Sequence, residues 1–241
     1  MKVVAIIPAR LKSTRLPNKI LADINGKTMI QHVYERVIKA HLHDVIVACD
    51  CIEIFNVVQS FGGKVMMTRD DHINGSSRIA EVAKNIDADI IVNIQGDEPL
   101  INDKLINRVI EAFIDEECVM ATLKQKIKNK DEVESPNCVK VITDKYHNAL
   151  YFSRLAMPYL RDKEEHVYFK HIGVYAYKKD FLLEYINMLP TELELAESLE
   201  QLRVLENGYK IKVLEVDSNL VGVDTQLDLE KVRELLKHGE Y

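Results

Sequence analysis

Long apolar runs are missing from this 241-residue sequence, and no stretch approaches the roughly 18 apolar residues needed to cross a bilayer. The chain opens on a predicted strand and carries no secretory signal pattern. We therefore expect a cytoplasmic protein with no membrane partner. The formal net charge of −6 leaves no basic excess, so we expect no nucleic-acid partner either.

Two glycine-rich phosphate-binding patterns, Gly-x-Gly-x-x-Gly and Gly-x-x-x-x-Gly-Lys-Ser/Thr, are also absent. Their absence excludes an ordinary dinucleotide-binding or P-loop site, so any phosphate has to be held by side chains and a metal ion. Cysteine is scarce, and the four cysteines include no Cys-x-x-Cys pair. We expect reduced thiols that neither bind a metal nor form disulfides.

What the sequence does contain is an alternation of short apolar stretches with helical patterns. Strands are predicted at residues 3–7, 45–49, 65–68 and 90–95, with a helix after each, the first capped by Thr28. This order is typical of an α/β fold with a mostly parallel sheet flanked by helices. The second half predicts further strands, one helix over residues 195–206 and a last helix capped by Thr225. We expect a single domain, residues 1–241, with an inserted β-rich lobe at about 125–190.

A cluster of positive charge follows the first strand, although the chain as a whole is acidic. Pro8 and Pro17 are expected to stop both strand and helix, which places the cations on a loop at the carboxyl end of the strand. Open α/β sheets bind their ligands at that edge. The loop is therefore either a clamp for a polyanion such as a triphosphate, or simply a solvated basic loop. The cations are Arg10, Lys12, Arg15 and Lys19.

Two acidic segments could complete such a site. Asp97 and Glu98 follow the fourth predicted strand directly, so they fall at the same edge of the sheet as the basic loop. A carboxylate facing a triphosphate needs a bridging cation, and Mg²⁺ prefers carboxylate, phosphate and water oxygens. A surface turn with two acids is the alternative. Asp224 is either a second metal ligand or, standing before Thr225, part of a helix cap.

Three further features allow more than one interpretation. His171 lies in a predicted strand, where a histidine is more often structural than catalytic. The guanidinium group of Arg154 could bind a substrate carboxylate through two N–H groups. Glu200 and Gln201 belong either to a solvated helix face or to a site that binds sugar hydroxyls. Residue chemistry alone leaves these alternatives open.

Taken together, the segments resemble the 3-deoxy-manno-octulosonate cytidylyltransferase family. They span nearly the whole chain in order, and jointly they are highly specific. The matching segments are residues 6–10, 13–17 with Lys19, 67–69 with His72, 92–99, 149–154, 171–175, 199–203 and 222–225.

The resemblance implies a nucleotidyltransferase-type, Rossmann-like fold with an inserted lobe used for sugar binding and dimerisation. It also implies that the protein is a homodimer. It implies a Mg²⁺-dependent transfer of CMP from CTP to the anomeric 2-hydroxyl of 3-deoxy-manno-octulosonate (KDO). Pyrophosphate is released and the sugar is activated for lipopolysaccharide synthesis. By resemblance, Arg10, Lys19 and Arg15 bind the triphosphate, Asp97 and Asp224 hold Mg²⁺, and Gln95 lies near nucleotide and sugar. The residues that would bind the sugar are Arg154, His171, Tyr175, Glu200 and Gln201.

One position departs from the family pattern. Relatives usually carry an acid before the arginine that corresponds to Arg78, whereas this chain has Ser77. A cytidylyltransferase for another acidic sugar, such as an 8-amino octulosonate or a nonulosonate, is therefore an alternative. A non-catalytic nucleotide-binding regulator is a further one. No general base stands out, and metal coordination could lower the pKa of the attacking hydroxyl.

Overall fold

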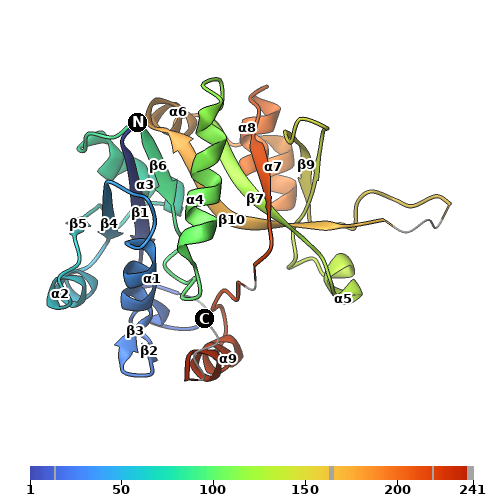
Figure 1. The fold of residues 1–241 in the computed structure, drawn as a ribbon. Coiled ribbons are helices and arrows are strands. Elements are labelled where there is room, and N and C mark those ends of the chain that lie inside the picture. The colour runs from blue at the N-terminus through green and yellow to red at the C-terminus, as the bar shows by residue number, and fades with distance from the viewer. Residues whose placement is uncertain (14, 163–165, 219, 238–241) are drawn as a thin grey trace. The chain divides into compact units, whose positions relative to one another are not determined.

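The computed structural model describes residues 1–13, 15–162, 166–218 and 220–237 (Figure 1). It divides into two compact units. Unit 1 comprises Met1–Asn107 and Asn219–Tyr241, and unit 2 comprises Arg108–Ser218. Unit 2 begins earlier and ends later in the sequence than the lobe expected at about residues 125–190. Across the described ranges, no helix has the length and apolar character that a membrane span requires.

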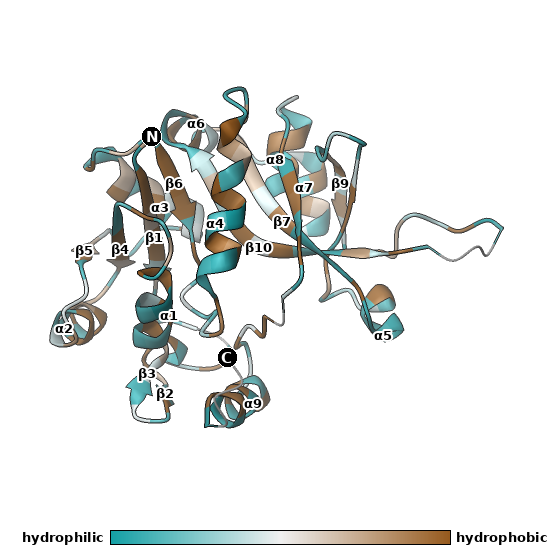
Figure 2. Ribbon diagram, viewed as in Figure 1, coloured by the Kyte–Doolittle hydropathy of each residue, from teal (hydrophilic) through white to brown (hydrophobic). Residues whose placement is uncertain are grey.

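Unit 1 is built on a parallel sheet with strand order β6-β1-β4-β5. Its central strand β1 is buried along almost its whole length, and β1 and β6 are brown in the hydropathy colouring of Figure 2. Helices α1, α2 and α3 connect or follow these strands and pack against them, so the predicted α/β architecture is confirmed. The bounds are β1 (Val3–Ala9), α1 (Met29–Val37), β4 (Asp44–Cys49), α2 (Ile52–Ser60), β5 (Val65–Met67), α3 (Gly75–Lys84) and β6 (Ile90–Asn93).

The prediction that Pro8 ends the first strand is wrong. Strand β1 continues through Pro8, which pairs with Ala48 of β4, to Ala9. On its other side, the pairing of β1 with β6 stops at Ile6. Pro8 therefore lies where β1 has only one neighbour, and a residue without an N–H is tolerated at such an edge position.

A short hairpin precedes α1. Strands β2 (Asp23–Ile24) and β3 (Lys27–Thr28) are joined by Asn25 and Gly26, whose φ angles of 53° and 88° fit the predicted turn. Thr28 does occupy the N-cap position of α1, but its side chain makes no capping bond. The expected cap is wrong in that respect: the Thr28 hydroxyl is buried without a hydrogen-bond partner among the described residues.

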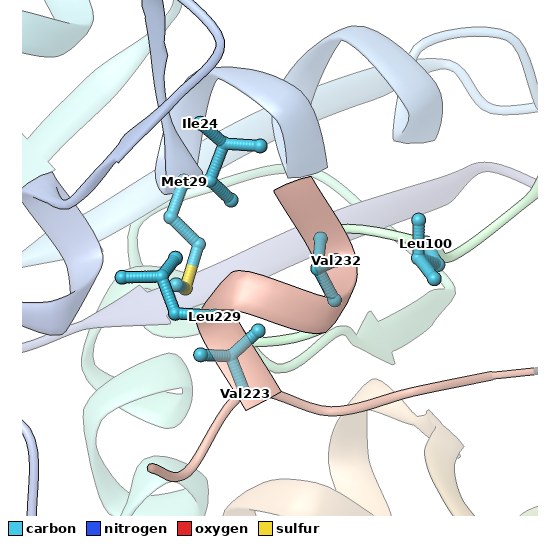
Figure 3. Packing of buried hydrophobic residues seen from close by; sticks show 6 residues of the cluster. All are labelled: Ile24, Met29, Leu100, Val223, Leu229 and Val232. Carbon is cyan, nitrogen blue, oxygen red and sulfur yellow. The ribbon is translucent and has the colours of Figure 1, made fainter. Parts of the chain in front are cut away.

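The C-terminal helix α9 (Gln226–Lys237) returns to unit 1 through an apolar cluster (Figure 3). Thr225 caps it as predicted: the Thr225 N–H donates to the Asp228 carboxylate at 2.8 Å, and the Asp228 N–H donates back to the Thr225 hydroxyl at 3.3 Å. Packing and cap together fix the segment just before the helix. The cluster is formed by Ile24, Met29, Leu100, Val223, Leu229 and Val232.

Unit 2 holds a mixed sheet. Strand β7 pairs in parallel with β11 and antiparallel with β10, β8 joins β10, and β9 pairs antiparallel with β8. The unit boundary at Asn107 falls inside helix α4. The bounds are α4 (Asp103–Glu111), η2 (Ala112–Ile114), β7 (Met120–Lys126), α5 (Lys130–Glu134), β8 (Lys140–Thr143), β9 (Ala149–Ser153), β10 (Phe169–Lys178), α6 (Lys179–Tyr185), α7 (Glu192–Glu197), α8 (Gln201–Glu206) and β11 (Lys212–Val216).

The single helix predicted over residues 195–206 is two helices, α7 and α8. The chain reverses at Ser198, whose φ of 51° ends α7. A buried ion pair then joins the two helices: Arg203 Nε donates to Glu194 Oε2 at 2.6 Å, and its Nη2 donates to Oε1. The Arg203 Nη1 donates to the Met188 carbonyl at 3.1 Å. The pair closes α8 against α7.

Replacing Arg203 with methionine should destabilise the protein by about 3–5 kcal/mol, because Glu194 would keep a buried charge without its partner. Urea unfolding measures this loss. The matched control is the double variant Arg203→Met/Glu194→Leu, which removes both charges and should recover much of the stability. An Arg203→Met variant as stable as the wild type would show that the ion pair does not hold the two helices.

Candidate active site

The candidate active site of unit 1 is a cavity of about 230 Å³ at the carboxyl edge of its parallel sheet. Strands β1 and β6 run parallel and adjacent, so the segments that leave them meet at this edge. Gly96 allows a close approach there, since a Cβ at this position would lie 2.9 Å from an Ile20 side-chain atom and 3.1 Å from the Pro8 carbonyl. The cavity is lined by Pro8, Arg10, Ser13, Arg15, Lys19, Ile20, Gln95, Gly96, Asp97 and Asp224.

Lys19 is the centre of the charged groups in this cavity. Its Nζ lies 2.5 Å from Asp97 Oδ2 and 3.1 Å from Asp224 Oδ1, and it donates to the Val223 carbonyl at 3.1 Å. The side chain is only 13% exposed. Burial alone would lower its pKa, but the Asp97 and Asp224 carboxylates outweigh it and the pKa is raised. Lys19 lies in the 3₁₀ helix η1 (Lys19–Leu21), not on the open loop that was expected.

Asp224 reaches Asp97 from the far end of the sequence. The Val223 N–H donates to the Asp97 carbonyl at 2.9 Å, and Val223 itself is anchored in the α9 cluster. Arg15 Nη2 pairs with Asp224 Oδ1 at 2.9 Å. Four of the predicted site residues are thus brought together by direct contacts.

Arg10 and Gln95 line the same cavity, and their side chains make fewer contacts with its charged groups. Arg10 is exposed and, among the described residues, has no acidic partner. Gln95 donates from Nε2 to the Asn93 side chain at 3.3 Å. Arg10 is therefore a cation that an anionic ligand can approach without displacing a protein carboxylate.

The donor set at Asp97 and Asp224 fits a magnesium ion. Each carboxylate bonds to the same ammonium group, so the two oxygens lie within a few ångströms of one another. The described residues include no group of three or more His, Cys, Asp or Glu that could enclose a metal alone. Mg²⁺ commonly takes one or two protein carboxylates and completes its shell with substrate phosphate and water. Two partly exposed carboxylates beside cations suit that arrangement.

Glu98 is a third acid at this site whose state the sequence did not reveal. Burial first, and the Asp97 and Asp224 charges second, raise its pKa to about 8 against the opposing effect of Lys19. Its Oε2 is buried without a hydrogen-bond partner in the described residues. Gly222 makes room for it, since a Cβ there would lie 3.0 Å from Glu98 Oε1. In the sequence, the only indication of this buried acid is that two acidic residues stand side by side after a buried strand.

The raised pKa of Glu98 predicts a pH-dependent stability. Between the unfolded pKa of about 4.5 and the folded pKa of about 8, the folded protein keeps a proton that the unfolded chain loses. Stability from this group should therefore fall as pH rises through that window. Glutamine does not titrate, so Glu98→Gln lacks this pH dependence. The free energy of unfolding of the variant, relative to that of the wild type, should therefore increase from pH 5 to 8. Urea unfolding in chelator measures it, and parallel stability curves would contradict the assignment.

In unit 2, His171 lies among aromatic rings on β10. Its ring is 5.1 Å from that of Phe152 and 5.2 Å from that of Tyr175. Burial lowers the pKa of His171 to about 3, so the imidazole is neutral at physiological pH. Burial first, and the neighbouring Tyr185 and Glu200 second, raise the pKa of Tyr175 well above its ordinary value. Both residues can therefore act as neutral hydrogen-bonding groups.

Arg154 is held by main-chain carbonyls. Its guanidinium donates to the carbonyls of Glu197, Pro136 and Ser198 at 2.8, 2.9 and 3.4 Å. Of its five N–H groups, at least two remain for a substrate carboxylate. Lys140, which sequence reasoning missed, is fully buried and donates to the Arg154 carbonyl at 2.6 Å. A lysine in a strand gives no sequence signal for this supporting role.

Glu200 and Gln201 stand at the start of α8. The Tyr185 hydroxyl donates to the Glu200 carbonyl at 3.1 Å, which fixes this helix end. Gln201 is buried, and its Nε2 has no hydrogen-bond partner among the described residues. Gln201 is thus an amide donor within the protein, and the interpretation as a solvated helix face does not hold for it.

Ser77 belongs to the first turn of α3, which begins at Gly75. The Ser77 N–H donates to the Asn74 side chain at 2.8 Å, and its hydroxyl donates to the Asn74 carbonyl at 3.0 Å. Asn74 is therefore the N-cap of the helix. The Ser77 hydroxyl is used within this turn.

The comparisons with known proteins agree with this arrangement. A family model described as cytidylyltransferase matches residues 4–211. The 3-deoxy-manno-octulosonate cytidylyltransferase of Fusobacterium nucleatum subsp. nucleatum is 55% identical over 99% of this chain and 98% of its own. The enzyme of that name from Geobacter sulfurreducens is 51% identical over 98% of this chain and all of its own.

Solved structures show the same relationship. The structure of a CMP:2-keto-3-deoxy-manno-octonic acid synthetase complexed with CTP superimposes with a TM-score of 0.96 at 44% identity, covering 99% of this chain and all of that one. A putative glucose-1-phosphate thymidylyltransferase from Bacillus anthracis, 18% identical with a TM-score of 0.68 over 97% of this chain and 94% of its own, shares the fold. With full-length matches above 50% identity and the converging site residues, the chain belongs to the 3-deoxy-manno-octulosonate cytidylyltransferase family.

Proposed function

We propose that this protein transfers CMP from CTP to the anomeric 2-hydroxyl of KDO and releases pyrophosphate. The observation that carries the proposal is the convergence of Lys19, Arg15, Asp97 and Asp224 on one cavity. Family membership supports it, because relatives above 50% identity bear the corresponding name.

The cations of unit 1 are assigned to the triphosphate. Arg10 has no acidic partner among the described residues, so it can bind a phosphate without giving up an ion pair. Arg15 and Lys19 are paired with carboxylates, so binding of the nucleotide requires them to share or exchange partners. Positive groups at this place stabilise the charge that spreads over the phosphates during transfer.

Asp97 and Asp224 would hold Mg²⁺ when the nucleotide binds. The bound ion would supply neutralisation of phosphate charge at the reacting α-phosphate. Lys19, which bridges the two carboxylates without the ion, would keep them in place for it.

The polar side chains predicted in unit 2 are assigned to the sugar. Arg154 suits the sugar carboxylate, while His171, Tyr175, Glu200 and Gln201 suit its hydroxyls; Gln95 of unit 1 is assigned to both substrates. In the reaction the anomeric oxygen forms a bond to the α-phosphorus, the bond to the leaving pyrophosphate breaks, and the hydroxyl proton passes to solvent. No covalent intermediate with the protein is needed. The homodimer and the cytoplasmic location stay predictions.

The substrate assignment is tested by comparing kcat/KM for KDO, its 8-amino analogue and a nonulosonate. We expect KDO to be preferred, because relatives above 50% identity bear the corresponding name. Because the Ser77 hydroxyl bonds within its own turn, Ser77→Asp should leave the order of the three sugars unchanged. A wild type that prefers the amino sugar, with preference reverting to KDO in Ser77→Asp, would overturn the substrate. A protein that binds CTP but releases no pyrophosphate with any sugar would instead be a regulator.

A further inference from the structure

Strand β10 contains an irregularity directly beside His171. Ile172 pairs with Leu123 of β7, but the next pair is Tyr175 with Thr122, so two residues of β10, Gly173 and Val174, have no counterpart. Such a bulge interrupts the ladder of backbone hydrogen bonds and re-aims the side chains next to it. The carbonyl groups inside it need another donor.

Thr122 supplies that donor from the neighbouring strand. Its side chain is fully buried, and its hydroxyl oxygen lies 3.1 Å from the Ile172 carbonyl and 2.8 Å from the Val174 carbonyl. The same oxygen lies 2.9 Å from His171 Nε2. One hydroxyl thus faces three potential acceptors, although it carries only one proton.

Counting protons decides how the imidazole is protonated. If Nε2 carried no hydrogen, the hydroxyl would have to donate to it, and both carbonyls would face an oxygen lone pair. If Nε2 carries the hydrogen, His171 donates to the Thr122 oxygen and the hydroxyl proton goes to a bulge carbonyl, the closer being that of Val174. The second arrangement makes two hydrogen bonds at the Thr122 oxygen instead of one, and it leaves only the Ile172 carbonyl, instead of both carbonyls, facing a lone pair.

We propose that Thr122 is a positioning residue that holds His171 as the neutral Nε2–H tautomer, so that Nδ1 is a hydrogen-bond acceptor for a hydroxyl of the sugar. This inference rests on the proposed function for the identity of the ligand, but its first part concerns the free protein. The Nδ1 atom has no hydrogen-bond partner among the described residues. A lone pair repels a carboxylate, so the tautomer assigns His171 to a hydroxyl group and leaves the carboxylate to Arg154.

The neutral state that the proposal requires agrees with the surroundings of the ring. Phe152 packs edge-on against it and Tyr175 lies on another side, and neither carries a charge at neutral pH. Burial lowers the pKa of His171 to about 3, so the cationic form does not compete at pH 7. The question at this site is therefore which of two neutral tautomers is present.

Long-range ¹H–¹⁵N correlation spectra of the full-length free protein at pH 7 test the tautomer, because the two ring nitrogens differ in shift according to which carries hydrogen. The His171 signals are assigned by their loss in His171→Gln. We expect a protonated Nε2 and an unprotonated Nδ1 in the wild type. A protonated Nδ1 would overturn the proposal without recourse to any variant.

Two variants separate a positioning role from simple filling of the bulge. Thr122→Val keeps the branched shape without the hydroxyl, and should populate the Nδ1–H tautomer and lower kcat/KM for the sugar about tenfold, with the KM for CTP unchanged. Thr122→Ser keeps the hydroxyl and should retain both properties. An unchanged tautomer in Thr122→Val would overturn the role of Thr122. If the free wild type shows the expected tautomer but is inactive toward KDO, the proposed function is rejected, and with it the assignment of Nδ1 to a hydroxyl of that sugar.

Discussion

Replacing Asp97 with asparagine is expected to reduce turnover at least a hundredfold while the protein stays folded. Asparagine keeps the size and one acceptor oxygen, but it removes the charge that faces Lys19 and that would hold Mg²⁺. Loss of a main contact to the charge that develops in the transition state typically costs about a hundredfold or more. Because Asp97 is partly exposed at the rim of a cavity, its replacement leaves the core untouched.

Steady-state pyrophosphate release at saturating CTP and sugar measures this effect. Asp87→Asn is the matched control, since Asp87 is an exposed acid of the same unit whose one ion-pair partner in the described part of the chain is Lys2. The turnover of this variant should equal that of the wild type. Circular dichroism shows that both variants are folded. Turnover of Asp97→Asn within a few-fold of the wild type at ordinary Mg²⁺ would rule out the metal-holding role.

Lys19→Met is expected to impair both catalysis and stability. A cation on a solvated loop would contribute little to stability. In the structure the ammonium bridges two carboxylates and a carbonyl, so removing it takes the cation away from Asp97 and leaves Asp224 with Arg15 alone. We expect a loss of about 1–3 kcal/mol in the free energy of unfolding, and a fall in turnover of about a hundredfold or more.

Urea unfolding with and without Mg²⁺ tests the second prediction independently of activity. An ion bound between the two carboxylates should stabilise Lys19→Met more than the wild type, because it replaces the missing charge. Arg10→Ala is the matched control: Arg10 is exposed and unpaired among the described residues, so its stability should change by less than about 0.5 kcal/mol while binding of CTP weakens. Equal stability of Lys19→Met and wild type in chelator would contradict the bridging role.

The strands of unit 1 were predictable from the sequence because burial on both faces leaves a direct mark. Val3 to Ile7 and Ile90 to Val92 are continuous apolar runs, and they form the adjacent strands β1 and β6. Their parallel pairing also makes the meeting of the basic segment and Asp97 predictable. Arg15 and Lys19 were found in this way.

Other features depend on contacts between residues far apart in sequence. Asp224 meets Asp97 because Val223 is anchored by the α9 cluster, and the sequence around Asp224 is equally typical of a helix cap. The role of Thr122 arises from a bulge in another strand, and the pair Arg203–Glu194 depends on a reversal at Ser198. Periodicity within one segment carries no information about such partners.

The most direct test of the central claim is a ³¹P NMR measurement on the purified protein with CTP, Mg²⁺ and KDO. The account predicts that the three CTP resonances decline together while pyrophosphate and one phosphodiester signal, that of the CMP–sugar product, appear in equal amounts. Omission of KDO should stop both products. Unchanged CTP in the complete mixture, or pyrophosphate without the phosphodiester, would contradict the proposed transfer.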